Sequence, residues 1–455
     1  MRERNGTTAI VIGAGMAGLV TARVLSDHVD RVTVLERDRL PQDAVTRRSV
    51  PQGRHAHVLL ARGQRLLDGW FPGLVDELVQ AGAVPLDAKD LVWHQAGAYR
   101  VRTDLGFLAM SMSRPLLEST VRERLLRQRS NVSLTDEAAV DRLILEGGRV
   151  AGVRVDGTEH RADLVVDCSG RNTRFLDQLA KAGFPAPEVS AVRVDTAYGT
   201  RIVRRRPDDL DGTLALVVDD PTRGHRMGTM VPVEGDRWII TVGSFHGDVP
   251  PTEPDEYEDF ARSLPSPVIA DVLARADAFT PVLSHRMPTS RRRRVERLER
   301  TPPGFVVLGD AICSLNPAHW QGMSSAALQA RALGQAVERH GPASPALAGD
   351  FYRRAAKVVD VPWKIAAEAD FADPRTSGPE PTGIDLVNRY LDKVLRACHT
   401  SIPVARQTLR VQNLLARPES LMTPAMVLRV LLAARRSPAG VEMPAAPSAR
   451  RRPTA

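Results

Sequence analysis

The stretch TAIVIGAGMAGLVTARVL, residues 8–25, decides the fold of this chain. Its apolar start, Thr8–Ile12, predicts a buried strand, and Met16–Leu25 predicts a helix. A second apolar run at Arg31–Leu35 predicts another strand soon after the helix. This strand, helix and strand form one compact unit. The sequence therefore predicts an α/β fold built on a parallel sheet.

The loop inside this unit, Gly13-Ala14-Gly15-Met16-Ala17-Gly18, has the GxGxxG spacing. Gly13 allows the tight turn, Gly15 lets a pyrophosphate approach the backbone, and Gly18 permits close packing of the helix. The amino end of the helix attracts the negative charge. Glu36 follows Gly18 by 18 residues, a position suited to binding ribose hydroxyls. The pattern predicts a dinucleotide site and leaves NAD and FAD both open.

A second informative stretch, GFVVLGDAICSLNPAHWQGMSSAAL, occupies residues 304–328. Its apolar run Phe305–Leu308 suits a central strand of the same sheet. Gly309 and Asp310 follow directly, and an Asp at such a strand end is placed to hold a polyhydroxyl chain, of which the flavin ribityl is one example. Two half-sites so far apart in sequence indicate one long cofactor.

Composition narrows the class of protein. The 455 residues exceed what one core usually holds, and 62 basic against 54 acidic residues give a net charge of +8. The densest Arg runs have no nucleic-acid module around them, so we expect no nucleic-acid partner. Three scattered cysteines match neither a disulfide framework nor a metal site, which favours the cytoplasm and no bound metal. No apolar run is long enough to predict a membrane span.

The order of the motifs resembles that of the class A FAD-dependent monooxygenases, which have the para-hydroxybenzoate hydroxylase fold. The resemblance rests on the glycine loop, Glu36-Arg37, Arg54 within PQGRHAH, Ser113-Arg114-Pro115 and Gly309-Asp310. More narrowly, PQGRHAHVLLARG, SRPLLE and GDAICSLNPAHWQGMSSAA resemble the actinobacterial branch that includes polyether epoxidases. The resemblance covers about residues 8–436 and implies FAD as cofactor, with NAD(P)H as reductant.

The resemblance also implies residue roles. Glu36 is expected to hold the adenosine ribose, Arg37 to lie near the adenosine and Asp310 to bind the ribityl. The full set of expected FAD contacts is Gly13, Ala14, Gly15, Ala17, Gly18, Glu36, Arg37, Arg54, Arg114 (pyrophosphate or ribityl), Val140 (backbone to adenine), Gly309, Asp310, Pro317, Gly322 and Met323. The expected catalytic positions are Arg54, near the isoalloxazine, and Pro317, His319 and Trp320.

Five parts of the chain follow from the resemblance and the patterns. We predict an FAD-binding domain in two pieces with a β-rich substrate domain inserted between them, then C-terminal helices and a disordered tail. The corresponding ranges are 1–190 and 286–345 for the FAD-binding domain, 191–285 for the substrate domain, 346–436 for the helices and 437–455 for the tail. Asp385 is expected to cap a helix whose apolar stripe packs against the catalytic body, with membrane attachment as the less favoured alternative.

Two positions depart from the family pattern. Ser169-Gly170 stands where relatives usually have Asp-Gly, which weakens any expectation about a nicotinamide site. Trp320 stands where relatives tend to have Gly, and its indole is expected to narrow the pocket, to stack beside the flavin or to impair oxygen access.

In the enzymes that this chain resembles, NAD(P)H reduces FAD, O2 adds at the flavin C4a carbon, and the hydroperoxide passes one oxygen atom to the substrate. We therefore predict oxygen insertion into an apolar polyketide, terpenoid or phenolic substrate of secondary metabolism, with alkene epoxidation ahead of aromatic hydroxylation. A partner flavin reductase is an alternative to direct reduction. The sequence does not single out one catalytic base. The candidates are His55, His57, His225, His246 and His319. A flavin dehydrogenase or ene-reductase like the geranylgeranyl reductases, and a non-catalytic accessory protein, remain open.

Overall fold

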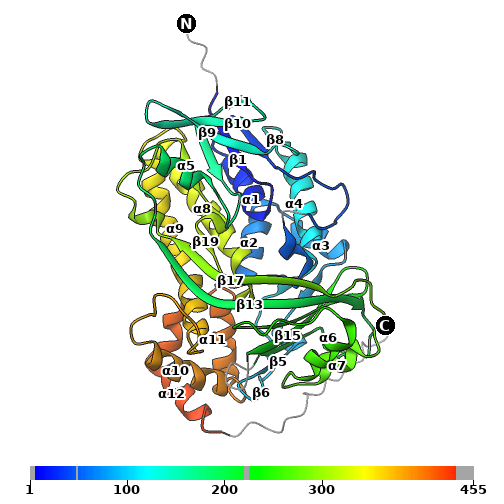
Figure 1. Cartoon of the computed structure of the whole chain (residues 1–455). Helices are drawn as coiled ribbons and strands as arrows, with labels where there is room; N and C mark the ends of the chain where they lie inside the picture. Colours follow the sequence, from blue (N-terminus) through cyan, green and yellow to red (C-terminus); the bar gives the residue numbers. More distant parts are fainter. Residues whose placement is uncertain (1–5, 48–49, 220–224, 437–455) are drawn as a thin grey trace, which may run out of the picture.

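The computed structural model describes residues 6–47, 50–219 and 225–436. The predicted tail, residues 437–455, lies outside the described residues. In Figure 1 the parallel sheet and its helices occupy the upper half of the molecule, and the larger β-sheet and the last helices occupy the lower half. The long strands β13 and β17 cross between the two halves.

The upper half is built on a five-stranded parallel sheet. Its strand order is β18 (Phe305–Val307), β12 (Leu164–Asp167), β1 (Thr8–Ile12), β2 (Arg31–Leu35) and β8 (Val132–Thr135). Helix α1 (Met16–Leu25) contacts α8 (Gly322–His340), which contacts α9 (Leu347–Asp370). An antiparallel sheet packs against β12 and comprises β9 (Val140–Glu146), β10 (Arg149–Val155) and β11 (Thr158–Arg161). The predicted unit β1–α1–β2 is confirmed residue for residue.

Strand β18 corrects one expectation. Its apolar run suited a central strand, but within the described part of the chain it pairs only with β12 and lies at the edge of the sheet. The run is apolar because all of Phe305–Val307 is buried. Helix α9 covers the exposed edge, where the Tyr352 hydroxyl lies 3.1 Å from the backbone nitrogen of Val307 and accepts its hydrogen bond. An edge strand protected in this way needs no second strand.

The lower half is built on an eight-stranded sheet. Its order is β19 (Cys313–Ser314), β17 (Leu283–Arg293), β13 (Val189–Arg204), β16 (Arg237–Ser244), β15 (Arg226–Val233), β14 (Ala215–Asp219), β5 (Leu91–Gln95) and β6 (Ala98–Tyr99). Helices α6 (Pro254–Arg262) and α7 (Val268–Leu273) share its apolar core. The sheet thus takes two strands from residues 91–99, because β5 pairs in parallel with β14. The domain boundaries themselves stay a prediction.

Short elements connect the halves around their junction. A small sheet contains β3 (Val58–Leu59), β7 (Ala109–Ser111) and β4 (Val84–Leu86). Helix α2 (Ala61–Trp70) contacts β7, and α3 (Leu74–Gln80) contacts α2 and α4 (Arg114–Gln128). Helix α5 (Phe175–Lys181) lies elsewhere and contacts β9. Single 3-10 turns occur at η1 (Pro51–Arg54), η2 (Ala88–Asp90), η3 (Val295–Arg297), η4 (Gly309–Ala311), η5 (Pro317–His319) and η6 (Pro418–Met422). Ser113 caps α4, accepting from the Leu116 amide at 3.2 Å.

The last helices, α10 (Ile384–Ala397), α11 (Ile402–Gln412) and α12 (Pro424–Ala433), enclose a small core of their own. Asp385 does not cap α10. The helix begins one residue earlier, after Gly383, whose φ of 76° a glycine adopts without strain. Within the described residues, no helix has both the length and the apolar composition needed to cross a bilayer. The predicted fold class is confirmed: a Rossmann-like domain, a β-sheet domain and C-terminal helices.

Candidate active site

A cavity of about 2060 Å³ lies where the two halves and the C-terminal helices meet. Its walls bring together positions that are hundreds of residues apart, from Gly13 to Asp310 and Met323. The predicted site residues that line it are Gly13, Gly15, Ala17, Glu36, Arg37, Arg114, Val140, Asp310, Pro317, His319, Trp320, Gly322 and Met323. The expected convergence of the two half-sites is therefore visible as one continuous space.

The glycine loop has the backbone geometry that its spacing predicts. Gly13 has a φ of 99°, and a Cβ on Gly18 would lie 1.8 Å from the Gly13 carbonyl oxygen. Gly15 precedes the first turn of α1, and no side chain caps that end. The free amide end of α1 thus faces the cavity and favours an anion there.

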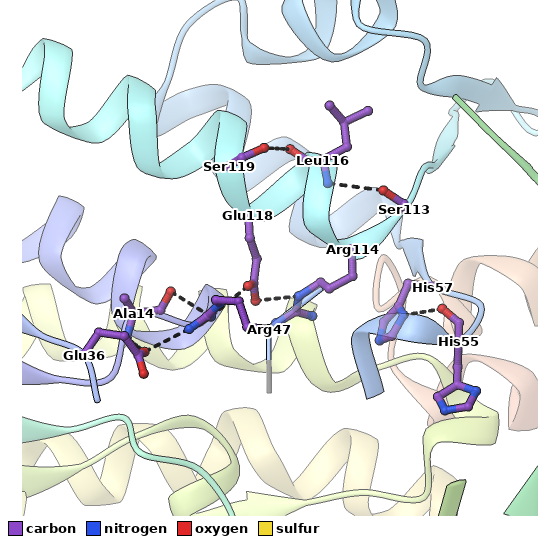
Figure 2. Close-up of polar contacts among 10 residues, drawn as sticks. All are labelled: Ala14, Glu36, Arg47, His55, His57, Ser113, Arg114, Leu116, Glu118 and Ser119. Atoms are coloured by element: carbon purple, nitrogen blue, oxygen red, sulfur yellow. Dashed lines mark hydrogen bonds and ion pairs between the residues drawn. The ribbon is translucent and has the colours of Figure 1, made fainter. Parts of the chain in front are cut away.

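Glu36 is held against this loop, as Figure 2 shows. Its carboxylate accepts from the Ala14 amide at 2.7 Å and from the Asp38 amide at 3.0 Å. Arg47 pairs with the same carboxylate at 3.0 Å. Glu36 is therefore buried and oriented at the end of β2, where its remaining acceptor capacity suits hydroxyl donors.

A chain of alternating charges continues from Glu36 across the cavity wall (Figure 2). Arg47 also pairs with Glu118 at 2.9 Å, and Arg114 pairs with the other oxygen of Glu118 at 2.7 Å. Burial by itself raises the pKa of Glu118, but the charges of Arg114 and Arg47 outweigh it and lower that pKa. Burial also acts to lower the pKa of Arg47, and its two carboxylate partners reverse the effect. Both shifts favour the charged forms of Glu118 and Arg47.

The second half-site closes over the first. A Cβ on Gly309, whose φ is 73°, would lie 2.8 Å from the Cβ of Ala17 in α1. The Gly309 amide donates to the Gln329 side chain of α8 at 2.9 Å. Burial raises the pKa of the neighbouring Asp310, while the charges of Arg114 and Arg171 act against this shift. Asp310 is partly buried and lines the cavity.

The loop between β19 and α8 is tied to the end of α9. Asn316 caps the turn η5 by accepting from the Ala318 amide at 3.2 Å, and its amide donates to Asp370 at 2.9 Å. The ring Nε2 of His319 lies 3.3 Å from the same Asp370 oxygen. Asp370 thereby fixes both ends of the segment that carries Pro317 and His319.

Trp320 ends this turn with a φ of 57° and a ψ of 18°, in the left-handed region. A bulky side chain rarely adopts this conformation, and glycine adopts it freely. The half-buried indole packs against the apolar cluster of the lower sheet and forms part of the cavity wall. The left-handed backbone thus explains why a glycine would suit this position. The tryptophan instead places its indole in the cavity wall.

Two histidines of the PQGRHAH segment lie on the cavity wall. Burial, with smaller contributions from neighbouring positive groups, lowers the pKa of His55 to about 3, and burial lowers that of His57 to about 4. Both rings are therefore neutral at pH 7. Nδ1 of His57 lies 2.9 Å from the His55 carbonyl oxygen, which can only accept, so Nδ1 carries the proton. His55 contacts the Thr200 hydroxyl at 2.7 Å.

The comparisons with known proteins agree with this geometry. Residues 6–360 match the family model described as FAD binding domain. The chain belongs to this family. Protein Rv3254 of Mycobacterium tuberculosis (strain ATCC 25618 / H37Rv) is 35% identical over 433 residues, which are 90% of this chain and 89% of that protein. Squalene epoxidase 2, mitochondrial, of Arabidopsis thaliana is 24% identical over 336 residues, 71% of this chain and 52% of the relative.

Among solved structures, PqsL, a probable FAD-dependent monooxygenase from Pseudomonas aeruginosa, has a TM-score of 0.62 at 18% identity, covering 80% of this chain and 94% of PqsL. This likeness shows the fold. The family model thus confirms the predicted FAD-binding family and FAD as the cofactor, and the solved structures confirm the predicted fold. The protein is accordingly an FAD-dependent enzyme, for which NAD(P)H is the reductant typical of the family.

The donor set of this flavoprotein fits FAD. The amide end of α1 and the guanidinium of Arg114 suit the pyrophosphate, Glu36 suits the ribose, and Asp310 suits the ribityl hydroxyls. Gly15 leaves open space, since the nearest atom to a Cβ there would be Oε1 of Glu118 at 3.9 Å. We propose these FAD contacts for the α1 amides, Arg114, Glu36 and Asp310.

Not every predicted residue reaches the cavity. Arg54 is exposed and lies outside its wall, whereas Gln52 and His55 line it. The backbone of His55 is extended, and its ring points into the protein, where it contacts Thr200. The neighbouring Arg54 side chain therefore faces solvent. Gly309, Ala14 and Gly18 do not line the cavity, and they shape the loops behind its wall through their backbone contacts. The carbonyl of Val140 lines the cavity but already accepts from Arg174 at 2.6 Å.

Ser169, which departs from the family pattern, forms its hydrogen bonds within its own loop. Its hydroxyl and amide donate to Asp167 at 2.6 and 2.9 Å, so the carboxylate at the end of β12 is satisfied by its own loop. His225 and His246 both line the cavity and share Asp373, at 2.6 and 3.4 Å. Burial acts to raise the pKa of Asp373, but hydrogen bonds from Arg375, together with electrostatic interactions with the two histidines, lower it to about 2.

Sequence reasoning missed Arg47, Glu118 and Asp370. Glu118 lies four residues after Arg114 on a predicted helix, and that spacing was a usable signal for an ion pair. Arg47 and Asp370 lie in or beside irregular segments and carry no local signal. Only the folded chain brings them to the site. Among the described residues, no group of carboxylate, histidine and cysteine side chains is arranged to hold a metal ion.

Proposed function

We propose that this flavoenzyme uses NAD(P)H and O2 to insert one oxygen atom into an apolar natural product, by epoxidation of an alkene. Bound FAD supplies the redox chemistry, taking electrons from the nicotinamide and activating O2. The substrate class is a polyketide or terpenoid with a double bond in an apolar chain. The proposed setting is the cytoplasm, with direct reduction by NAD(P)H preferred over a partner flavin reductase.

The observation that carries this proposal is the weak basicity of His55 and His57 on the cavity wall. Aromatic hydroxylation profits from a base that deprotonates a phenol, whose pKa is about 10. Proton transfer from a phenol to His55 or His57, with pKa values of about 3 and about 4, would cross a gap of roughly seven or six pH units, or about 8 to 10 kcal/mol. Burial lowers the pKa values of His246 and His285 as well. Epoxidation needs no such base.

The chain's own residues then have positioning tasks. The amide end of α8, at Gly322 and Met323, lines the cavity and favours negative charge next to it. Pro317, which has no amide proton, shapes the turn beside that helix end. The indole of Trp320 and the neutral ring of His57 line the cavity without adding a charge to its wall. Such a lining excludes water and orients an apolar chain.

Aromatic hydroxylation is the second candidate, and one observation favours it. His319 lies 3.3 Å from the buried Asp370, and a carboxylate in that position orients an imidazole for proton transfer. A phenolic substrate docked near this pair would have a base available.

Mass spectrometry of products formed under labelled O2 tests the proposal. The holoenzyme is supplied with NADH or NADPH and with a panel of polyenes and phenols. We expect one labelled oxygen atom in an epoxide derived from a polyene. A labelled phenol product instead selects hydroxylation, and His319→Gln should then lower kcat and change its pH profile.

Other outcomes select the remaining alternatives. A reduced or desaturated product without label would indicate a flavin dehydrogenase or ene-reductase. A purified protein that is colourless and takes up no FAD would indicate an accessory protein. Turnover that requires an added flavin reductase, and that NAD(P)H alone does not support, would establish the partner.

A further inference from the structure

Helix α12 exposes an apolar face to solvent. Leu428, Leu431 and Leu432 are 59%, 38% and 54% exposed, and their spacing places them on one side of the helix. Val430 and Ala433, on the other side, are buried against α10 and α11. One side of α12 thus stabilises the helical region, and the other side has no partner among the described residues. Grouped leucines on a surface mark an interaction site more often than single ones do.

This face continues to the mouth of the cavity. Leu386 of α10 and Met422 before α12 are 68% and 61% exposed, yet both also line the cavity. Side chains that belong both to the wall and to the surface mark an opening. Val427, next to Leu428, lines the cavity too. The opening is therefore rimmed by the same helices that carry the exposed leucines.

The charge of this region is strongly one-sided. Residues 384–436 contain nine Lys and Arg against three Asp and Glu, a net charge of +6 out of +8 for the whole chain. All nine basic residues are exposed. Arg429 lies within the leucine-bearing stretch of α12, and Arg435 and Arg436 follow it directly. Exposed leucines with flanking Arg residues are the composition of a helix that lies in a membrane interface.

We propose that the face formed by α10, α11 and α12 docks on an anionic phospholipid bilayer, with the leucines of α12 in the interface and the Arg side chains at the headgroups. A second copy of this chain fits less well, because it would bring a second charge of +6 against the first. Residues 437–455 carry three Arg and one Glu, so they also add positive charge rather than complement it. Docking would turn the cavity mouth toward the lipid and admit an apolar substrate from it. That consequence rests on the proposed function, whereas the docking itself does not.

Vesicle sedimentation of the full-length holoenzyme tests the docking. We expect binding to vesicles that contain phosphatidylglycerol, little binding to pure phosphatidylcholine, and weaker binding as salt is raised. The double variant Leu428→Gln, Leu432→Gln should weaken binding about tenfold or more. The matched control is Phe279→Gln, which replaces an exposed aromatic residue in the loop before β17 and should bind as the unaltered protein does.

Charge variants test the second half of the proposal. Arg435→Gln with Arg436→Gln should weaken binding to phosphatidylglycerol vesicles roughly thirtyfold. The control pair, Arg154→Gln with Arg161→Gln, lies on β10 and β11 at the opposite end of the molecule (Figure 1) and should leave binding unchanged.

Equal binding to both vesicle types, or binding to neither, would overturn the proposal. A dimer in light scattering that Leu428→Gln dissociates would assign the face to a second copy, and vesicle binding gained on deletion of residues 437–455 would assign it to that segment. Because sedimentation needs no turnover, its failure is distinguishable from a failure to incorporate labelled oxygen.

Discussion

The two ends of the cavity are built by different physical means. At the end formed by α1 and α4, charges alternate from Glu36 through Arg47 and Glu118 to Arg114. At the end formed by α10 and α12, the wall is mainly apolar and includes exposed leucine and methionine side chains. The first end is specified by backbone geometry and ion pairs, and the second by packing alone. A fixed cofactor needs the former, and a variable apolar substrate is served by the latter.

The largest expected effect is at the polar end. Gly18→Ala places a methyl group 1.8 Å from the Gly13 carbonyl oxygen, so the backbone must move. We expect a loss of about 3 kcal/mol of stability and of most bound flavin. Gly69→Ala in α2 is the matched control, because nothing lies within 4 Å of its Cβ and a helical alanine stabilises by up to about 1 kcal/mol. Thermal unfolding and flavin absorbance measure both. A yellow, stable Gly18→Ala protein would contradict the assigned close packing.

Asp310→Ala should have the next largest effect. Loss of the hydrogen bonds between the ribityl hydroxyls and the Asp310 carboxyl group should weaken FAD binding about tenfold to a hundredfold. Titration of the apoprotein with FAD, followed by fluorescence, measures the change. Asp141→Ala replaces an exposed aspartate of β9 and should leave the affinity unaltered. An unchanged flavin affinity in the Asp310 variant would rule out its assignment to the ribityl.

His55 lies between the two ends and should make stability depend on pH. Its pKa is about 3 in the folded protein and about 6.5 when exposed, so the unfolded chain binds the proton more tightly. This contribution to stability is complete above pH 6.5 and is lost as the pH falls toward 3. His55→Asn keeps a polar atom near Thr200 but does not titrate, and it should flatten the fall in stability between about pH 6 and 4.

Denaturant unfolding at a series of pH values measures this slope. Because His57 is also shifted, to about 4, part of the slope should remain in the His55 variant. A slope identical to that of the unaltered protein would show that His55 does not titrate as a buried group.

The smallest effect on stability is expected from Trp320→Gly, in the turn before α8. Glycine relieves about 1 kcal/mol of left-handed strain, which offsets part of the lost packing of the indole. We expect stability to change by only about 1 kcal/mol, with a shift toward bulkier products and a lower ratio of product to NAD(P)H consumed. Trp320→Ala opens the same space without relieving the strain, so the two variants separate volume from backbone. Identical product profiles in all three proteins would remove Trp320 from the substrate wall.

The sequence by itself determined the cofactor end of the molecule. The unit β1–α1–β2, the glycine positions and Glu36 follow from local periodicity and from backbone conformations that only glycine adopts, and both are properties of neighbouring residues. The β-rich character of residues 191–285 also follows from local patterns and turns. Gly309-Asp310 was found because it directly follows an apolar strand.

Only the tertiary structure decided the rest, because the relevant contacts join segments far apart in the chain. The position of β18 at an edge depends on Tyr352, and the entry of β5 into the lower sheet depends on β14. Arg47 and Glu118 are separated by 71 residues, and Asn316 and Asp370 by 54. The sequence also did not predict that one side of α12 is exposed. An apolar helical stripe predicts burial, and only the packing of the helices shows which part of it stays uncovered.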